Sequence, residues 1–180
     1  NILEACAEAG NRNRAFVFAS TSKMTFAGGG LSLFATSPEN MEWFTARLSK
    51  RTIGPDKLNQ LRHVRFLKDQ AGIDRLMEGH RRLLAPKFEA VDTTLTDRIG
   101  DTGAAVWTKP KGGYFISVDT VDGCAKRVVE LAKEAGLTLV PAGAAFPYRQ
   151  DPRDRNLRLA PSFPSLDEVR TAADAVSTCI

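Results

Sequence analysis

Residues 15–23 read Ala-Phe-Val-Phe-Ala-Ser-Thr-Ser-Lys, and this stretch decides how the chain is interpreted. Its five opening residues form a short continuous apolar run, which is typical of a strand buried on both faces. Burial at the end of such a strand removes water from Lys23, and a desolvated lysine is partly neutral and therefore nucleophilic towards an aldehyde. Ser20 and Ser22 place hydroxyl groups beside it. The stretch predicts a lysine that bonds to a carbonyl compound.

Three consecutive glycines, Gly28 to Gly30, follow the lysine closely. Glycine lets the backbone approach a ligand, and backbone N–H groups in such a loop can hold a phosphate. This combination suits a phosphate-bearing carbonyl cofactor, and pyridoxal phosphate is one that a lysine holds. A P-loop does not fit because Lys23 precedes the glycines, and a dinucleotide fingerprint needs glycine where Leu33 stands. A Ser-x-Ser-Lys taken alone is more often a surface loop, so the flanking segments carry this interpretation.

The composition is that of an ordinary folded protein, with 43% hydrophobic and 26% charged residues among 180. The 25 basic and 21 acidic residues give a net charge of +4 and are scattered, which does not predict a nucleic-acid partner. No apolar run approaches the ~20 residues that a membrane span needs. Cys6, Cys124 and Cys179 are widely spaced and form neither a metal cluster nor a disulfide framework, which favours a reducing, cytoplasmic setting. Because residue 1 is Asn and the chain opens inside a predicted helix, we expect it to be the C-terminal part of a longer polypeptide.

The first part of the chain predicts strands between helices. Gly10 is a helix stop, and Ser37-Pro38 is a helix start because a hydroxyl caps the first turn and proline fits its geometry. Gly54-Pro55 ends that helix before another begins. The expected elements up to this point are a helix over 2–9, strands over 15–19 and 31–35, and a helix that carries Met41, Phe44 and Leu48 at helical spacing.

Apolar residues at helical spacing from Ile73 to Ile99 predict one long helix, and Pro86 is expected to kink or break it. We expect the domain boundary to run through this helix, around 73–99. Residues 1–75 then end a first domain, and residues 76–180 form a smaller mixed α/β domain.

The smaller domain is predicted to contain four short strands and two helices. A capping box at Ser165 and Glu168 marks the start of the last helix. The expected strands are residues 104–107, 114–118, 137–140 and 157–160, and the expected helices are residues 126–135 and the segment after Ser165.

Arg158 is the second candidate functional residue. It alternates with Leu157 and Leu159 in a predicted strand, so its side chain faces the opposite side of the sheet from theirs. A guanidinium fork suits bidentate capture of a carboxylate, although an isolated strand arginine is more often simply exposed. His63 and His80 each stand alone on helical segments, and we interpret both as surface or boundary histidines without a role.

These segments together resemble the fold-type-I, pyridoxal-phosphate-dependent aminotransferases. The match rests on residues 16–23, on residues 109–115 (Lys-Pro-Lys-Gly-Gly-Tyr-Phe), and on residues 136–143 followed by 157–159. The closest similarity is to a bacterial aspartate aminotransferase subgroup whose lysine segment runs into a glycine-rich stretch. The resemblance implies an α/β fold in which residues 1–75 end a large cofactor-binding domain, with a mostly parallel sheet and helices, and residues 76–180 form a small α+β C-terminal domain.

The resemblance also implies roles for single residues. Lys23 would hold pyridoxal 5'-phosphate covalently and move a proton between the substrate Cα and the cofactor. Ser20 and Ser22 would bind the cofactor phosphate, and Arg158 would bind the substrate α-carboxylate. No metal is implied. The substrates would be an acidic amino acid, with aspartate the best match, and a 2-oxo acid, and the enzyme would be a homodimer.

The sequence departs from the family pattern at two points. Many members carry a phosphate-binding arginine seven or eight residues after the lysine, where this chain has Gly30 and Leu31. The aspartate that partners the pyridinium nitrogen lies upstream of the lysine in the family, and no Asp occurs between residue 1 and Lys23. Phosphate binding must then rest on backbone and hydroxyl groups or on residues outside the chain, and we expect the partner of the pyridinium nitrogen to lie outside the chain.

Two alternatives stay open at this point. The second hypothesis after the aminotransferase is an aminotransferase-like sensor domain of a transcription regulator, which binds the cofactor without turnover. It is also compatible with an enzyme of the same fold that catalyses β-elimination or decarboxylation, because one fold hosts many chemistries.

Overall fold

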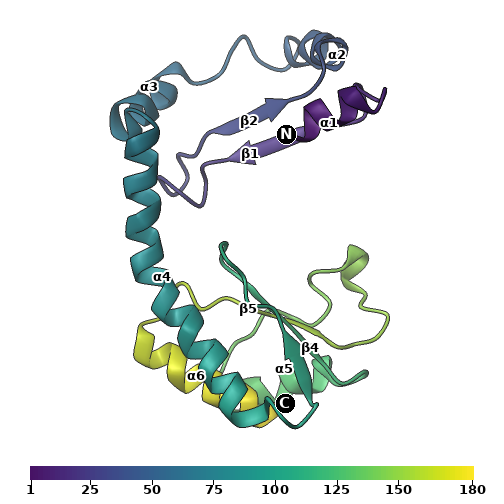
Figure 1. The fold of residues 1–180 in the computed structure, drawn as a ribbon, viewed down its shortest axis with the longest axis vertical. Helices are drawn as coiled ribbons and strands as arrows, with labels where there is room; N and C mark the ends of the chain where they lie inside the picture. Colours follow the sequence, from purple (N-terminus) through teal and green to yellow (C-terminus); the bar gives the residue numbers. More distant parts are fainter. The chain divides into compact units, whose positions relative to one another are not determined.

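The computed structural model describes all of residues 1–180, and the chain divides into two compact units. The N-terminal unit is Asn1–Glu78 and the C-terminal unit is Gly79–Ile180. Each unit has one small sheet, of two strands in the first and three in the second. Helix α4 (Gln70–Ile99) runs from the first unit into the second (Figure 1).

Helices flank the two strands of the N-terminal unit, as expected. Ser37 caps α2 by accepting a hydrogen bond from the Asn40 N–H, and Asp56 caps α3 by accepting one from the Asn59 N–H. The expected helix start at Ser37-Pro38 is therefore confirmed. The elements of this unit before α4 are α1 (Ile2–Glu8), β1 (Val17–Ser20), β2 (Ser32–Ala35), α2 (Pro38–Leu48) and α3 (Lys57–Leu67).

The strands of the N-terminal unit differ from the expectation in burial and direction. β1 and β2 pair antiparallel, with Phe18 opposite Phe34, so this chain contains none of the expected parallel sheet. Phe18 is 73% exposed and Leu33 is 57% exposed, so the prediction of strands buried on both faces is wrong here. The reason is geometric, because a two-stranded ribbon has no further strand beside it. On one side Phe34 packs against Phe44 of α2, with ring centroids 4.5 Å apart and ring planes tilted by 44°.

Helix α4 confirms the long helix predicted from Ile73 to Ile99, and it begins at Gln70. Pro86 lies inside the helix without ending it, so the predicted break is absent. Proline removes one hydrogen bond of the helix. Downstream of Pro86, burial of Val91, Leu95 and Ile99 holds the helix in place and keeps this loss local.

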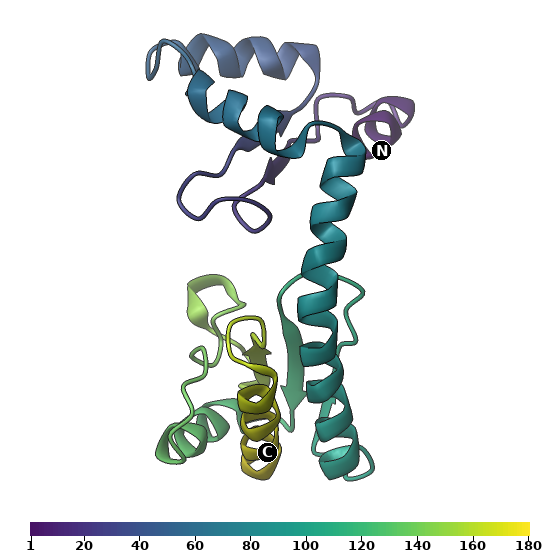
Figure 2. The ribbon, with the colours of Figure 1, turned by 90° about the vertical axis from the view of Figure 1, so that its left-hand side faces the viewer.

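The C-terminal unit is a three-stranded antiparallel sheet of order β3-β4-β5 with helices packed on it (Figure 2). Residues 137–140, predicted as a strand, are not one. Leu137 and Leu139 pack partly against the core without pairing to a strand, and Pro141, which follows, has no N–H to continue a ladder. The other predicted strands and helices are present. The elements after α4 are β3 (Ala105–Trp107), β4 (Ile116–Thr120), α5 (Ala125–Glu134), the 3₁₀ turn η1 (Pro147–Arg149), β5 (Asn156–Leu159) and α6 (Leu166–Cys179).

The buried core of the chain lies in the C-terminal unit. Along β4 and β5 every second side chain is buried, which is the period-two pattern of a sheet covered on one face. The capping box of Ser165 and Glu168 is formed and begins α6. The buried hydrophobic side chains of this cluster are Val91, Leu95, Ile99, Ala105, Ile116, Val118, Ala125, Val128, Leu157, Leu159, Val169, Ala173 and Val176.

Candidate functional site

Lys23 lies in a tight turn directly after β1. The N–H groups of Met24 and Thr25 both donate to the Thr21 carbonyl, at 2.8 and 3.0 Å, and close the turn around the lysine. The Thr21 N–H donates to the Leu31 carbonyl at 2.9 Å, and the Leu31 N–H donates back to Thr21 Oγ1 at 2.8 Å. These paired bonds close the loop between β1 and β2 at its base, so they hold the backbone of Lys23 in place within the unit.

The side chain of Lys23 is exposed in this chain. The expectation that burial of the strand end would desolvate Lys23 is therefore wrong in this chain. The cause is the one found for the strands, because the two-stranded ribbon that leads to Lys23 is itself exposed.

Ser20 and Ser22 are brought together beside the lysine, as the sequence predicted. Their Oγ atoms lie 2.5 Å apart, and the Ser22 N–H donates to Ser20 Oγ at 3.1 Å. Gly30 packs on Ser22, since a Cβ at that position would come within 2.9 Å of Ser22 Oγ and 3.0 Å of Ser22 Cα. Of the three glycines, Gly30 therefore meets a steric requirement.

The paired serines fit a phosphate group. One hydroxyl hydrogen suffices for the bond between the two Oγ atoms, so the other hydrogen remains to donate to an anion. Both side chains are exposed, and no carboxylate is hydrogen-bonded to either. The loop thus offers hydroxyl donors and a close backbone approach beside Lys23, and such a donor set suits the phosphate of pyridoxal phosphate.

The interpretation of His63 on α3 as a surface or boundary histidine is wrong, because its side chain is only 2% exposed. Its Nε2 lies 2.8 Å from Thr25 Oγ1 and 3.3 Å from Thr21 Oγ1, and its Nδ1 lies 2.9 Å from the Asn59 carbonyl oxygen. The only signal for this contact in the sequence is a single histidine on a helical segment, and that signal is weak. His63, Thr21 and Thr25 are the residues near Lys23 that sequence reasoning missed.

Arg158 lies on β5, in register with Ser117 of β4. The predicted alternation is confirmed, because Leu157 and Leu159 are buried in the core and Arg158 is half-buried on the opposite face. Its guanidinium carbon lies 4.5 Å from the centroid of the Phe115 ring. The buried Nε has no hydrogen-bond partner. A carboxylate that accepts from Nε and one Nη would satisfy this donor, so the observed geometry fits the predicted carboxylate clamp.

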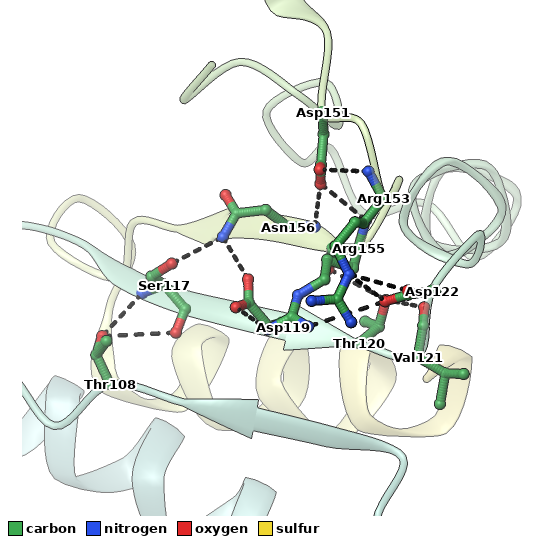
Figure 3. Close-up of polar contacts among 10 residues, drawn as sticks. All are labelled: Thr108, Ser117, Asp119, Thr120, Val121, Asp122, Asp151, Arg153, Arg155 and Asn156. Carbon is green, nitrogen blue, oxygen red and sulfur yellow. Dashed lines mark hydrogen bonds and ion pairs between the residues drawn. The ribbon is translucent and has the colours of Figure 1, made fainter.

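A polar network fixes the start of β5 and therefore the strand that carries Arg158 (Figure 3). The Asp151 carboxylate accepts from the backbone N–H groups of Arg155 and Asn156, both at 2.8 Å. The Asn156 side-chain amide donates to Ser117 Oγ at 2.9 Å and to Asp119 Oδ1 at 2.7 Å. Arg155 Nη2 donates to Asp119 Oδ2 at 2.6 Å.

The same network depresses the pKa values of two carboxyl groups. Hydrogen bonds from the Arg155 guanidinium and from the Asn156 amide hold the pKa of Asp119 below its ordinary value. Burial works to raise the pKa of Asp151, but the backbone N–H groups of Arg155, Asn156 and Arg153 outweigh it and the pKa is lowered. Both carboxylates are therefore ionised at neutral pH and keep their hydrogen bonds there.

Comparison with known proteins identifies the family. Residues 1–180 match the family model described as aspartate amino-transferase. The chain belongs to this family. A protein of Mycolicibacterium smegmatis that is named as an aminotransferase is 54% identical over 179 residues, which is 99% of this chain and 42% of that protein.

Solved structures agree with this assignment. An aspartate transaminase from Corynebacterium glutamicum superposes with a TM-score of 0.97 at 50% identity, over 100% of this chain and 42% of that one. An α-aminoadipate aminotransferase from Thermus thermophilus, solved in complex with N-(5'-phosphopyridoxyl)-L-leucine, has a TM-score of 0.77 at 21% identity, over 99% of this chain and 44% of that one. The second likeness shows the fold alone.

The family resemblance seen in the sequence is thus confirmed, and the chain spans 42% of the length of the Mycolicibacterium relative. No helix in the structure combines the length and the apolar character that crossing a bilayer demands.

Proposed function

We propose that the full-length protein is a pyridoxal-phosphate-dependent aminotransferase that moves the amino group of an acidic amino acid, with aspartate as the substrate, to a 2-oxo acid. Family membership and the 50% identical aspartate transaminase support this proposal. The observation that carries it is the loop after β1, where paired serine hydroxyls and the close approach of Gly30 surround the turn that presents Lys23.

Pyridoxal phosphate, when bound, supplies an electron sink that makes the Cα proton of an amino acid acidic. Lys23 would hold the cofactor through Nζ and would then move a proton between the substrate Cα and the cofactor, as a general acid and base at that atom. We propose that the rest of the polypeptide covers this exposed side chain in the full-length protein and excludes water from it.

Ser20 and Ser22 would donate hydroxyl hydrogen bonds to the cofactor phosphate. Arg158 would bind the substrate α-carboxylate through Nε and one Nη, because the bidentate fork fixes the orientation as well as the charge. Asp151 and Asn156 would act on the same step indirectly, by holding the start of β5.

The wider organisation is proposed on the same basis. Residues 1–75 would end the large cofactor-binding domain, and residues 76–180 would form the small domain. The enzyme would be a homodimer, as the family resemblance implies. The three free cysteines suit the proposed cytoplasmic location.

Borohydride reduction of the full-length protein loaded with pyridoxal phosphate tests the site. Reduction makes the lysine–cofactor linkage permanent, and peptide mapping is expected to find the label on Lys23. Label on another lysine would overturn the assignment. Product analysis with aspartate and 2-oxoglutarate is expected to show amino transfer, whereas release of ammonia or carbon dioxide would indicate β-elimination or decarboxylation instead.

A further inference from the structure

His63 is unusual within the N-terminal unit. Within Asn1–Glu78 only Ser37 and His63 are buried, and Ser37 is accounted for as the cap of α2. A buried polar side chain is costly unless it is hydrogen-bonded. His63 is bonded at both ring nitrogens, and the partners of Nε2 are both in the turn that carries Lys23.

The partners fix the tautomer of the neutral ring. The Asn59 carbonyl oxygen only accepts, so Nδ1 carries the proton and donates to it. Nε2 is then an acceptor, and the Thr25 hydroxyl at 2.8 Å is its donor. Thr21 Oγ1 lies 3.3 Å from the same nitrogen and accepts from the Leu31 N–H. His63 Nε2 thus contacts the hydroxyl groups of the residues two positions before and two positions after Lys23 in the sequence.

The turn geometry places these hydroxyls on the opposite side from Lys23. The bond from the Thr25 N–H to the Thr21 carbonyl makes residues 21–25 one helical turn. Residues four apart on such a turn share a face, and the residue midway between them points away from it. Thr21 and Thr25 are accordingly half-buried against His63, while Lys23 is exposed.

We infer that His63 is a positioning residue for Lys23, which holds the inner face of the turn through Thr25 and Thr21 and so fixes the direction in which the lysine points. The inference rests on the proposed function of Lys23. His63 does not touch the reacting atoms, and it acts on them by restricting the turn. An edge-on contact with the ring of Phe26, at 5.3 Å between centroids, holds the imidazole ring from another side.

The contact can be broken in full-length protein at either end. His63→Leu removes the ring acceptor, and Thr25→Val removes one hydroxyl from a side chain of nearly the same shape. Thr25→Ser keeps the hydroxyl and serves as the rescue variant. Thr36→Val is the matched control, because Thr36 is also half-buried in this unit and its hydroxyl bonds to the Ala15 carbonyl instead.

Two measurements report on Lys23 without turnover: retention of pyridoxal phosphate on dialysis, and the rate at which borohydride fixes it to Lys23. A lost hydrogen bond of this kind corresponds to about a tenfold change. His63→Leu and Thr25→Val are each expected to lower retention and the fixation rate about tenfold. Because they remove the same contact, the double variant is expected to be little worse than either single one. Thr25→Ser and Thr36→Val are expected to behave like the wild type.

The outcomes separate this inference from the proposed function. Wild-type protein that is not labelled at Lys23 would overturn both. Wild-type protein labelled at Lys23, together with a Thr25→Val variant that keeps the cofactor and is fixed at the wild-type rate, would overturn the role of His63 alone. An equal loss in Thr36→Val would also overturn it, because the effect would then come from general loosening of the unit. If His63→Leu does not fold, Thr25→Val alone still tests whether the contact with His63 affects cofactor retention and the fixation rate.

Discussion

Lys23 and Arg158 are supported in different ways by the two units. The turn of Lys23 is held by hydrogen bonds to a single buried histidine, beside a ribbon whose Phe18 is 73% exposed. Arg158 stands on a strand whose neighbours Leu157 and Leu159 are buried in the main core, and a polar network holds the start of that strand. The C-terminal unit can thus hold its residue with its own packing, whereas the N-terminal unit relies on directional bonds between one loop and α3. Substitutions in either unit can break or sharpen this difference.

The largest expected effect separates the chemical roles of the two residues in full-length enzyme. Lys23→Ala removes the proposed acid and base, and kcat is expected to fall by at least about 10²–10⁴, the range typical of such groups. Arg158→Lys keeps a positive charge but loses the fork, so KM for the amino acid is expected to rise with a smaller change in kcat. Steady-state kinetics with aspartate measure both. Equal losses in kcat from the two variants would contradict the assigned division of roles.

Core truncation tests where the stability of the 180-residue chain resides. Leu95 is 0% exposed in the C-terminal unit, and Leu95→Ala is expected to lower the free energy of unfolding by about 2–5 kcal/mol. Phe18→Ala in the exposed ribbon is expected to change it by less than about 0.5 kcal/mol. Urea denaturation of the isolated chain, refolded and kept at a concentration low enough to prevent association, measures the difference by circular dichroism. A Phe18 effect as large as that of Leu95 would show that the ribbon is packed in solution.

The exposed ribbon also affects solubility. Apolar side chains and unpaired strand edges favour association between copies. We therefore expect the 180-residue chain to aggregate when it is expressed without the rest of the polypeptide, as size-exclusion chromatography would show. A soluble monomer with one cooperative melting transition would contradict this expectation.

Acid should weaken the support of Arg158 through Asp119. Because its pKa is lower in the folded chain than the ordinary 3.8, Asp119 contributes stability that is fully present above the unfolded value and is lost as the pH falls through the folded one. Stability of the C-terminal unit is therefore expected to fall below about pH 4. Asp119→Asn should flatten this part of the pH profile of the melting temperature. An unchanged slope would indicate that other carboxylates, Asp151 among them, dominate.

The sequence predicted those features that depend on local chemistry. Ser165 and Glu168 marked the start of α6, and the alternation around Arg158 placed its side chain on the correct face, because capping and strand period are decided by neighbouring residues. The direction of β1 and β2 and their exposure could not be read in this way. An apolar run has the same pattern in a covered sheet as in an uncovered ribbon.

His63 shows the other limit of sequence reasoning. Its partners Thr21 and Thr25 lie about forty positions away along the chain, and no periodicity links them. The prediction of a strand over residues 137–140 was wrong because Leu137 and Leu139 pack on the core without joining the sheet. Both cases depend on tertiary contacts, which a single sequence does not display.

The smallest expected effect compares two helix caps that are chemically alike. Ser37 caps α2 in the N-terminal unit and Ser165 caps α6 in the C-terminal unit, each by accepting a backbone N–H. Replacing either by Ala removes about 1 kcal/mol of helix stability.

For Ser165→Ala this loss should lower the free energy of unfolding of the whole unit, because Val169 and Val176 of α6 belong to its core. For Ser37→Ala the loss should remain local, because no residue of α2 is buried, and it should appear as faster amide hydrogen exchange in α2 alone. Faster exchange throughout the N-terminal unit would instead mean that α2 and the Lys23 loop unfold together.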